Sequence, residues 1–158
     1  MIEAELRALN NSLIENRMVI GPAFSTIADL VLKHGRPYTR QPLPKREWQK
    51  EMGACFGNAL WAAKTRRYIY VEGYAIGTLG SGRPQHHAWL TDPDNPIVAY
   101  DPTWGQGGAA YFGIPFRLEY LLKTQAESGH PGVLDTWELG WPLVSGKHRI
   151  EDAIWRPK

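Results

Sequence analysis

The sequence of 158 residues contains a single cysteine, Cys55, and no long run of apolar residues. One cysteine excludes an internal disulfide and a zinc site built from several cysteines. The lack of a long apolar run predicts that no segment spans a membrane. The first residues are partly acidic, whereas a secretion signal starts with basic residues and continues into an apolar stretch. We therefore expect a cytoplasmic protein with no membrane partner.

A large excess of charge is also missing. The formal net charge at pH 7 is +2, which predicts no nucleic-acid partner. His34, His130 and His148 have no partners at the spacing of metal ligands, so no metal site is predicted. The glycine-rich segment 77–82 lacks the lysine of a phosphate-binding loop, so no cofactor is expected. The length fits a single domain over residues 1–158.

The first part of the chain is predicted to be helical. Apolar residues at spacings of three and four indicate an amphipathic helix over residues 2–17. A second helix is predicted between Ser25, as its N-cap, and Gly35, where it stops. Three prolines make residues 36–45 an extended connection. Good helix formers then predict a third helix, which starts in this region or, over residues 55–64, at the cysteine.

The second part of the chain is predicted to contain strands. β-Branched and aromatic residues predict strands over residues 68–76, 87–90 and 97–101. A turn sequence at residues 92–96 joins the second and third of these strands in a hairpin. Another helix is predicted over residues 116–126, and the last 30 residues are expected to be irregular with a short strand. This order predicts an α+β fold in which N-terminal helices pack on an antiparallel sheet.

Cys55 is the strongest candidate for a reactive group. It lies where a helix is predicted to start, and a helix N-terminus favours the thiolate, the nucleophilic form of a cysteine. Gly53 and Gly57 flank it, and small residues let a substrate backbone come close. The alternative is an inert buried cysteine, which is the ordinary role of a lone cysteine in a cytoplasmic chain.

A histidine and an aspartate complete a candidate triad. His86 and His87 are adjacent, so in a strand their side chains point to opposite faces and only one can face Cys55. His87 is the candidate base, and His86 is expected to be a surface or core residue. Asp101 lies fourteen residues after His87, which suits the two arms of a hairpin and would bring the side chains together. The alternative role of Asp101 is that of a turn residue before Pro102.

Attack of a thiolate on a carbonyl also requires donors for the oxyanion. The backbone N–H of Cys55 at the helix start is one candidate. The side-chain amide of Gln49, six residues before the cysteine, is a second, and the indole N–H of Trp48 is a third. The alternative, which explains Gln49 equally well, is that it is an exposed residue of a helix.

Together these residues resemble the transglutaminase-like superfamily of papain-type thiol enzymes. The order cysteine, histidine, aspartate is that of the family, and residues 87–89 (His-Ala-Trp) and 101–103 (Asp-Pro-Thr) resemble its histidine and aspartate motifs. Residues 70–75 resemble its strand between nucleophile and histidine, and Gln49 resembles the oxyanion glutamine of papain-like proteases. The resemblance covers roughly a third of the chain. Phe56 follows the cysteine, where the family usually has a small residue and then tryptophan.

The resemblance implies a papain/transglutaminase-like fold and acyl transfer through a thioester on Cys55. His87 and Asp101 would complete the catalytic triad, and Gln49 would bind the oxyanion. A peptide or protein is the implied substrate, and hydrolysis of an amide bond, as in a cysteine protease or deamidase, is the expected reaction. The alternatives are a protein-crosslinking transglutaminase and a non-catalytic peptide-binding module on the same fold.

Overall fold

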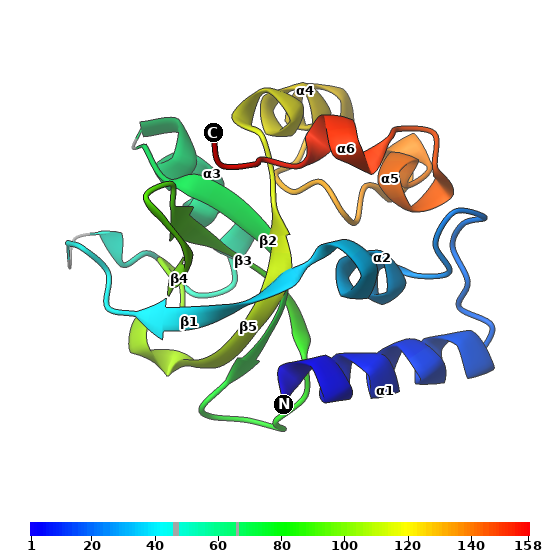
Figure 1. Cartoon of the computed structure of the whole chain (residues 1–158), viewed down its shortest axis with the longest axis horizontal. Helices are drawn as coiled ribbons and strands as arrows, with labels where there is room; N and C mark the ends of the chain where they lie inside the picture. The colour runs from blue at the N-terminus through cyan, green and yellow to red at the C-terminus, as the bar shows by residue number, and fades with distance from the viewer. Residues whose placement is uncertain (46–47, 66) are drawn as a thin grey trace.

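The computed structural model describes residues 1–45, 48–65 and 67–158 and has an α+β fold. In this part of the chain, five strands close into a small mixed barrel, and helices lie around its outer surface (Figure 1). The strands are β1 (Arg36–Gln41), β2 (Ile69–Gly77), β3 (Gln85–Asp92), β4 (Asn95–Tyr100) and β5 (Gly108–Pro115). The helices are α1 (Ile2–Glu15), α2 (Ile27–His34), α3 (Cys55–Thr65), α4 (Leu118–Ser128), α5 (Pro142–Ser145) and α6 (Ile150–Ala153).

The strands follow the order β1-β4-β3-β2-β5, and β5 pairs with β1 to close the barrel. β3 and β4 form the predicted antiparallel hairpin, with Leu90 opposite Tyr100. The prediction of an antiparallel sheet is wrong for one pair, because β1 runs parallel to β4 with Thr39 opposite Val98. Strand directions cannot alternate all the way round a closed ring of five, so a barrel of this size must contain a parallel pair.

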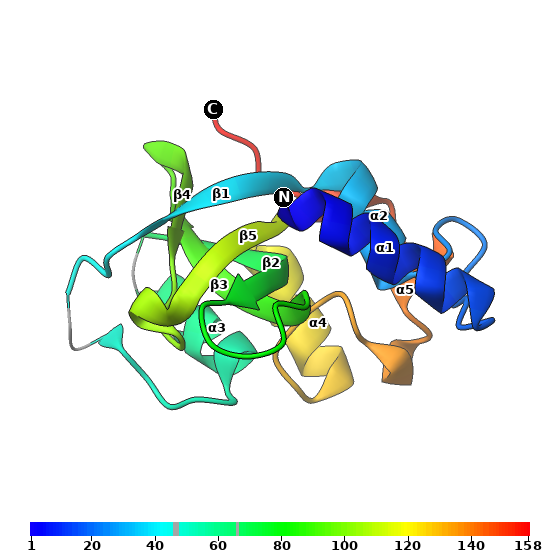
Figure 2. The same cartoon turned by 90° about the horizontal axis from the view of Figure 1, so that it is seen from below.

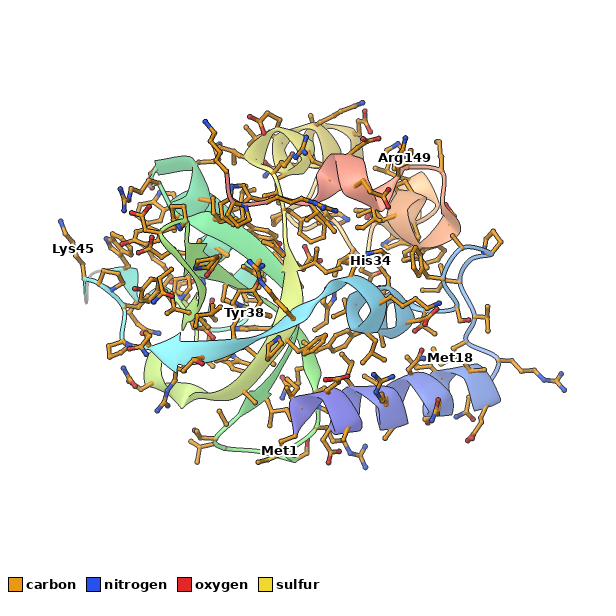
Figure 3. All side chains as sticks on the ribbon, in the orientation of Figure 1. Met1, Met18, His34, Tyr38, Lys45 and Arg149 are labelled. Carbon is orange, nitrogen blue, oxygen red and sulfur yellow. The ribbon has the colours of Figure 1, made fainter. Side chains whose placement is uncertain are left out.

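The inside of the barrel is filled by side chains that point inward from all five strands, the largest of them aromatic. The buried members of this cluster, which we call the barrel cluster, are Tyr38, Val71, Ala75, Trp89, Ala99 and Tyr111. Tyr38 lies on β1, the strand that crosses the front of the barrel in Figure 3. Trp89 is fully buried, and Gly113 gives it space, because a Cβ at position 113 would lie 2.6 Å from the indole ring.

The helices cover the outer face of the barrel and form the larger core with it. α3 packs on β2 and β3, whereas α1 and α2 pack on each other and on β5 (Figures 1 and 2). Among the described residues, no helix combines the length and the apolar character that crossing a membrane requires. Buried residues of all six helices join one core cluster, and α3 is the helix that carries the cysteine.

The start of α2 corrects a prediction. Thr26, not Ser25, is the N-cap, and its side chain accepts a hydrogen bond from the backbone N–H of Asp29 at 3.0 Å. Ser25 instead donates its backbone N–H to the Asp29 carboxylate at 2.9 Å. Asp29 thus bonds with both residues that precede the helix, and the cap on Thr26 explains why the helix starts one residue later than expected. The helix ends before Gly35, as predicted.

Most of the other predicted elements are confirmed. The structure differs from the prediction at β5 and in the last 30 residues. α3 starts at Cys55, and α4 covers most of the helix predicted over residues 116–126. β5 was not predicted. In the last 30 residues, the short helices α5 and α6 replace irregular chain, and Ile154 forms an isolated bridge with Phe116 in place of a short strand.

Candidate active site

Cys55 is the first residue of α3, and 9% of its surface is exposed. The backbone N–H of Asn58 donates to the carbonyl of Ala54 at 2.9 Å, which places the first turn of the helix directly at the cysteine. The N–H groups of a first turn have no partners within their helix and give the helix N-terminus a partial positive charge. The unpaired N–H groups of this turn provide a donor for an oxyanion beside Cys55.

His87 and Asp101 are held together at the open ends of the β3–β4 hairpin. His87 lies near the start of β3, and Asp101 directly follows β4. The Nε2 atom of His87 lies 2.8 Å from Oδ2 of Asp101, and both side chains are buried. The structure therefore brings the two side chains together in the way that the hairpin predicted.

The carboxylate of Asp101 receives hydrogen bonds from four donors. Its Oδ1 accepts the backbone N–H groups of Thr103 at 2.8 Å and of Trp104 at 2.9 Å. Its Oδ2 accepts from the hydroxyl of Tyr111 and pairs with His87, both at 2.8 Å. A buried carboxylate is costly unless its oxygens are paired, and hydrogen bonds to charged groups are the strong ones. This cradle fixes the direction of Asp101 and therefore the plane of the imidazole.

The His87 ring interacts with both Asp101 and Cys55. Burial alone would lower the pKa of His87, but hydrogen bonding and charge from Asp101 and Cys55 outweigh it and raise the pKa from 6.5 to about 9. Because Asp101 pairs with Nε2, Nδ1 is the ring nitrogen that is left for a second partner. At neutral pH the imidazole is therefore protonated.

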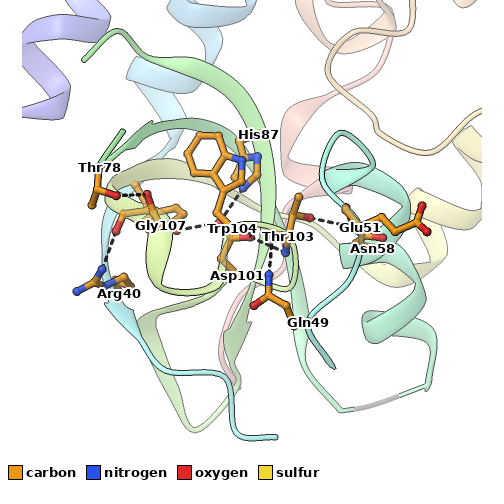
Figure 4. A network of polar contacts seen from close by, with 12 residues as sticks. Arg40, Gln49, Glu51, Asn58, Thr78, His87, Asp101, Thr103, Trp104 and Gly107 are labelled. Carbon is orange, nitrogen blue, oxygen red and sulfur yellow. Dashed lines mark hydrogen bonds and ion pairs between the residues drawn. The ribbon is translucent and has the colours of Figure 1, made fainter. Parts of the chain in front are cut away.

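Aromatic rings enclose the imidazole. Trp104 stacks on His87 with ring centroids 4.0 Å apart and an angle of 21° between the planes (Figure 4). Trp89 and Tyr111 lie farther away within the barrel, each at 6.4 Å between centroids. The face of an indole attracts a cation, so this stacking favours the protonated ring and shields it from water.

The segment before the cysteine is hydrogen-bonded to the turn that carries Asp101 (Figure 4). The backbone N–H of Lys50 donates to the carbonyl of Pro102 at 2.7 Å. The side-chain amide of Asn58, one turn into α3, donates to the hydroxyl of Thr103 at 2.9 Å and to the carbonyl of Glu51 at 2.9 Å. These bonds hold the start of α3 close to the turn of Asp101, although the two are far apart in the sequence.

Gln49, the candidate oxyanion donor, is part of the same connection. Its Nε2 donates to the carbonyl of Thr103 at 2.6 Å. Gly105 in the next turn has φ +55 and leaves space for this side chain, because a Cβ there would lie 2.2 Å from Oε1 of Gln49. The contact seen for Gln49 is thus with the Asp101 turn. An amide nitrogen carries two hydrogens, so one N–H of Gln49 remains for another acceptor.

His86 belongs to a second polar network on the opposite face of β3. Its Nε2 lies 2.9 Å from Oε1 of Glu72, a residue of β2 that is fully buried. Glu72 also accepts the hydroxyl of Tyr70 at 2.7 Å and the backbone N–H groups of Val133 at 2.8 Å and Leu134 at 3.1 Å. Burial would raise the pKa of Glu72, but these partners, His86 first, lower it. Glu72 thus fastens the segment after α4 to the barrel.

Two hollows are lined by residues that are close in sequence to the candidate residues. One, of about 260 Å³, is bordered by Phe56 and His86, the immediate neighbours of Cys55 and His87 in the sequence. The other, of about 310 Å³, is bordered by Gln49 and by the turn that follows Trp104. Neither of these two hollows is lined by Cys55, His87 or Asp101 themselves.

Several residues of the site were not singled out from the sequence. Tyr111 lies on the unpredicted β5, so nothing local connected it with Asp101. Glu72 gave a usable signal, since a carboxylate inside an otherwise apolar strand is costly to bury without partners. Among the described residues, no group of three or more histidine, cysteine, aspartate or glutamate side chains is arranged to hold a metal ion.

Comparisons with known proteins do not assign the chain to a family. No family model matches it, and neither the curated proteins nor the solved structures give a significant match. The functional argument therefore rests on the geometry of the site and on the motifs of the sequence.

Proposed function

We propose that the protein is a thiol-dependent acyl-transfer enzyme of the transglutaminase-like type, which hydrolyses amide bonds in a peptide or protein. The observation that carries this proposal is the His87 ring, which pairs with Asp101 through Nε2 and interacts with Cys55 at the start of α3. A nucleophile, a base and an orienting carboxylate in this relation are the parts that a cysteine hydrolase uses.

The reaction would proceed in two steps. The Cys55 thiolate attacks the amide carbonyl, a C–S bond forms, and the carbonyl oxygen becomes an oxyanion. The His87 imidazolium gives its proton to the nitrogen as the C–N bond breaks, which releases an amine or ammonia and leaves a thioester. Neutral His87 then takes a proton from water, the C–O bond forms, the C–S bond breaks, and the thiolate–imidazolium pair is restored.

The oxyanion would be bound beside the helix start. The backbone N–H of Cys55 is positioned there by the first turn of α3. The second N–H of the Gln49 amide is our other candidate, because the first is held by Thr103. Removal of one oxyanion donor typically costs about 10²- to 10³-fold in rate.

The experiment uses a tryptic digest of casein as the substrate mixture and compares the wild-type protein with Cys55→Ala. Mass spectrometry of the peptides distinguishes new chain ends, conversion of glutamine to glutamate, and incorporation of an added labelled amine. We expect hydrolytic products that depend on Cys55, together with a transient acyl adduct on the cysteine. Amine incorporation in place of hydrolysis would identify a crosslinking enzyme, and identical digests would contradict the proposal.

A further inference from the structure

Tyr111 shares an oxygen of Asp101 with the candidate base. Its hydroxyl donates to Oδ2 of Asp101 at 2.8 Å, and the same oxygen pairs with Nε2 of His87 at 2.8 Å. The two backbone N–H donors of the following turn bind the other oxygen, Oδ1. Tyr111 is therefore the side chain that competes directly with His87 for the negative charge of Oδ2.

The position of this hydroxyl is fixed by its surroundings. Tyr111 is 1% exposed, and its ring packs edge-on against Trp89 with centroids 5.1 Å apart. Gly108 leaves space for the phenol, because a Cβ there would lie 1.6 Å from the hydroxyl oxygen. The backbone φ of Gly108 is −83, which any residue can adopt, so the need for glycine comes from the phenol alone.

The phenol is a neutral donor throughout the working pH range. Burial and then the charge of Asp101 raise the pKa of Tyr111 above its usual value, although Arg40 opposes the shift. A hydrogen bond to a carboxylate oxygen draws charge from it. The attraction between that oxygen and the His87 imidazolium is then weaker than it would be without the phenol.

We propose that Tyr111 is a positioning residue of the triad that holds Oδ2 of Asp101 in place and limits how tightly the carboxylate binds the His87 imidazolium. The consequence rests on the proposed function: an imidazolium that is held too tightly would give its proton to the leaving nitrogen more slowly. General acids work best when their proton affinity matches the operating pH. Tyr111 would thus change, through Asp101, how tightly His87 holds its proton, and it would not contact the substrate.

The other charged or titratable groups near this pair come from two elements, α3 and β1. Cys55 on α3 interacts with His87 from its other side. Arg40 on β1 donates to the carbonyl of Gly108 at 3.1 Å, a hydrogen bond that does not involve the hydroxyl of Tyr111. Tyr38, also on β1, belongs to the barrel cluster, and its hydroxyl accepts from Arg36 at 3.2 Å. Tyr38 therefore offers a matched control in the same cluster.

The experiment measures the rate at which iodoacetamide alkylates Cys55 between pH 5 and pH 10, in the wild type, Tyr111→Phe and Tyr38→Phe. Cys55 is the only cysteine, so the mass of the whole protein reports its modification. The upper inflection of the profile reports loss of the His87 proton. We expect Tyr111→Phe to raise this inflection by about half to one pH unit, a three- to tenfold gain in proton affinity, and Tyr38→Phe to leave it in place.

A second variant, Gly108→Ala, displaces the phenol without changing residue 111, and it should move the inflection in the same direction. Circular dichroism checks that each variant is folded, and NMR titration of the His87 ring gives the same shift by an independent route. An inflection that stays at the wild-type pH, or one that falls, in either folded variant would overturn the proposal. Alkylation requires no substrate, so this result is separate from whether the casein digest is hydrolysed.

Discussion

His86 and His87 are neighbours in the sequence, yet they belong to separate networks on the two faces of β3. His87 points into the barrel and pairs with Asp101 at 2.8 Å, whereas His86 points outward and pairs with Glu72 at 2.9 Å. Two histidine–carboxylate pairs thus lie back to back on one strand. The pair that interacts with Cys55 is the inner one.

The first prediction separates the two histidines. His87→Ala removes the proposed base and should lower Cys55-dependent turnover by about 10²- to 10⁴-fold. His86→Ala should keep turnover within about tenfold of the wild type and instead lower the free energy of unfolding by roughly 1 to 3 kcal/mol, because Glu72 loses a buried partner. Peptide hydrolysis and urea denaturation measure the two effects. Equal loss of turnover in both folded variants would contradict the assignment of the base.

The second prediction concerns Asp101→Asn. The amide keeps the shape but removes the negative partner of the His87 imidazolium, so less of Cys55 should be present as thiolate. In serine triads the equivalent change costs about 10⁴-fold, whereas a thiol depends less on its base, so we expect a loss of roughly ten- to a thousand-fold. Iodoacetamide labelling across pH measures the effect.

The control for Asp101→Asn is Asp94→Asn, which changes an exposed aspartate in the turn of the same hairpin. Its labelling profile should match that of the wild type. If the profile of Asp101→Asn also coincided with the wild type, the aspartate would be a turn residue and the site a dyad of Cys55 and His87.

The third prediction concerns stability and pH. The pKa of His87 is raised from 6.5 to about 9 by its partners, so the folded protein binds this proton more tightly than the unfolded chain. The resulting stabilisation is fully present below about pH 6.5 and is lost as pH rises through about 9, on the order of 3 kcal/mol in all. Urea denaturation at several pH values should show this loss in the wild type and a flatter dependence in His87→Gln. Parallel curves would show that the proton is not held by the fold.

The fourth prediction concerns Glu72→Gln. The new amide nitrogen cannot accept the hydrogen bonds that a carboxylate oxygen accepts now. Buried donors, among them backbone N–H groups, would therefore lose their partner. We expect the free energy of unfolding to fall by about 3 kcal/mol, in the range for breaking a buried charged network. Glu119→Gln, an exposed change at the start of α4, should alter it by less than about 0.5 kcal/mol. Similar effects of the two changes would mean that Glu72 does not fasten the segment at residues 133–134.

The parts of the site that carry local signals were predictable. Helix formers after Cys55 marked the start of α3, and the turn sequence before β4 marked the hairpin that joins His87 to Asp101. The single parallel pair was harder to predict. The prolines in and after β1 indicate an extended connection, and this segment is a strand because it pairs with β4 on one side and β5 on the other.

Long-range contacts account for what was missed. β5 begins with small residues of low strand propensity and is stabilised by pairing with β1 and β2. No local pattern therefore indicated that Tyr111 contacts Asp101. The spacing of Gln49 placed it near the site, but only the folded chain shows that its amide is bonded to Thr103. A sequence pattern identifies reactive groups more readily than the residues that hold them.

The closed ring of strands also limits how a peptide can be recognised. Each of the five described strands has a neighbour on both sides, so this sheet has no free edge. A peptide therefore cannot bind to it by strand addition, in which main-chain hydrogen bonds extend a sheet. The backbone of these strands therefore cannot recognise a peptide, and side chains and loops around the cysteine would select the substrate. The same closure protects the barrel from edge-to-edge aggregation with other copies of the chain.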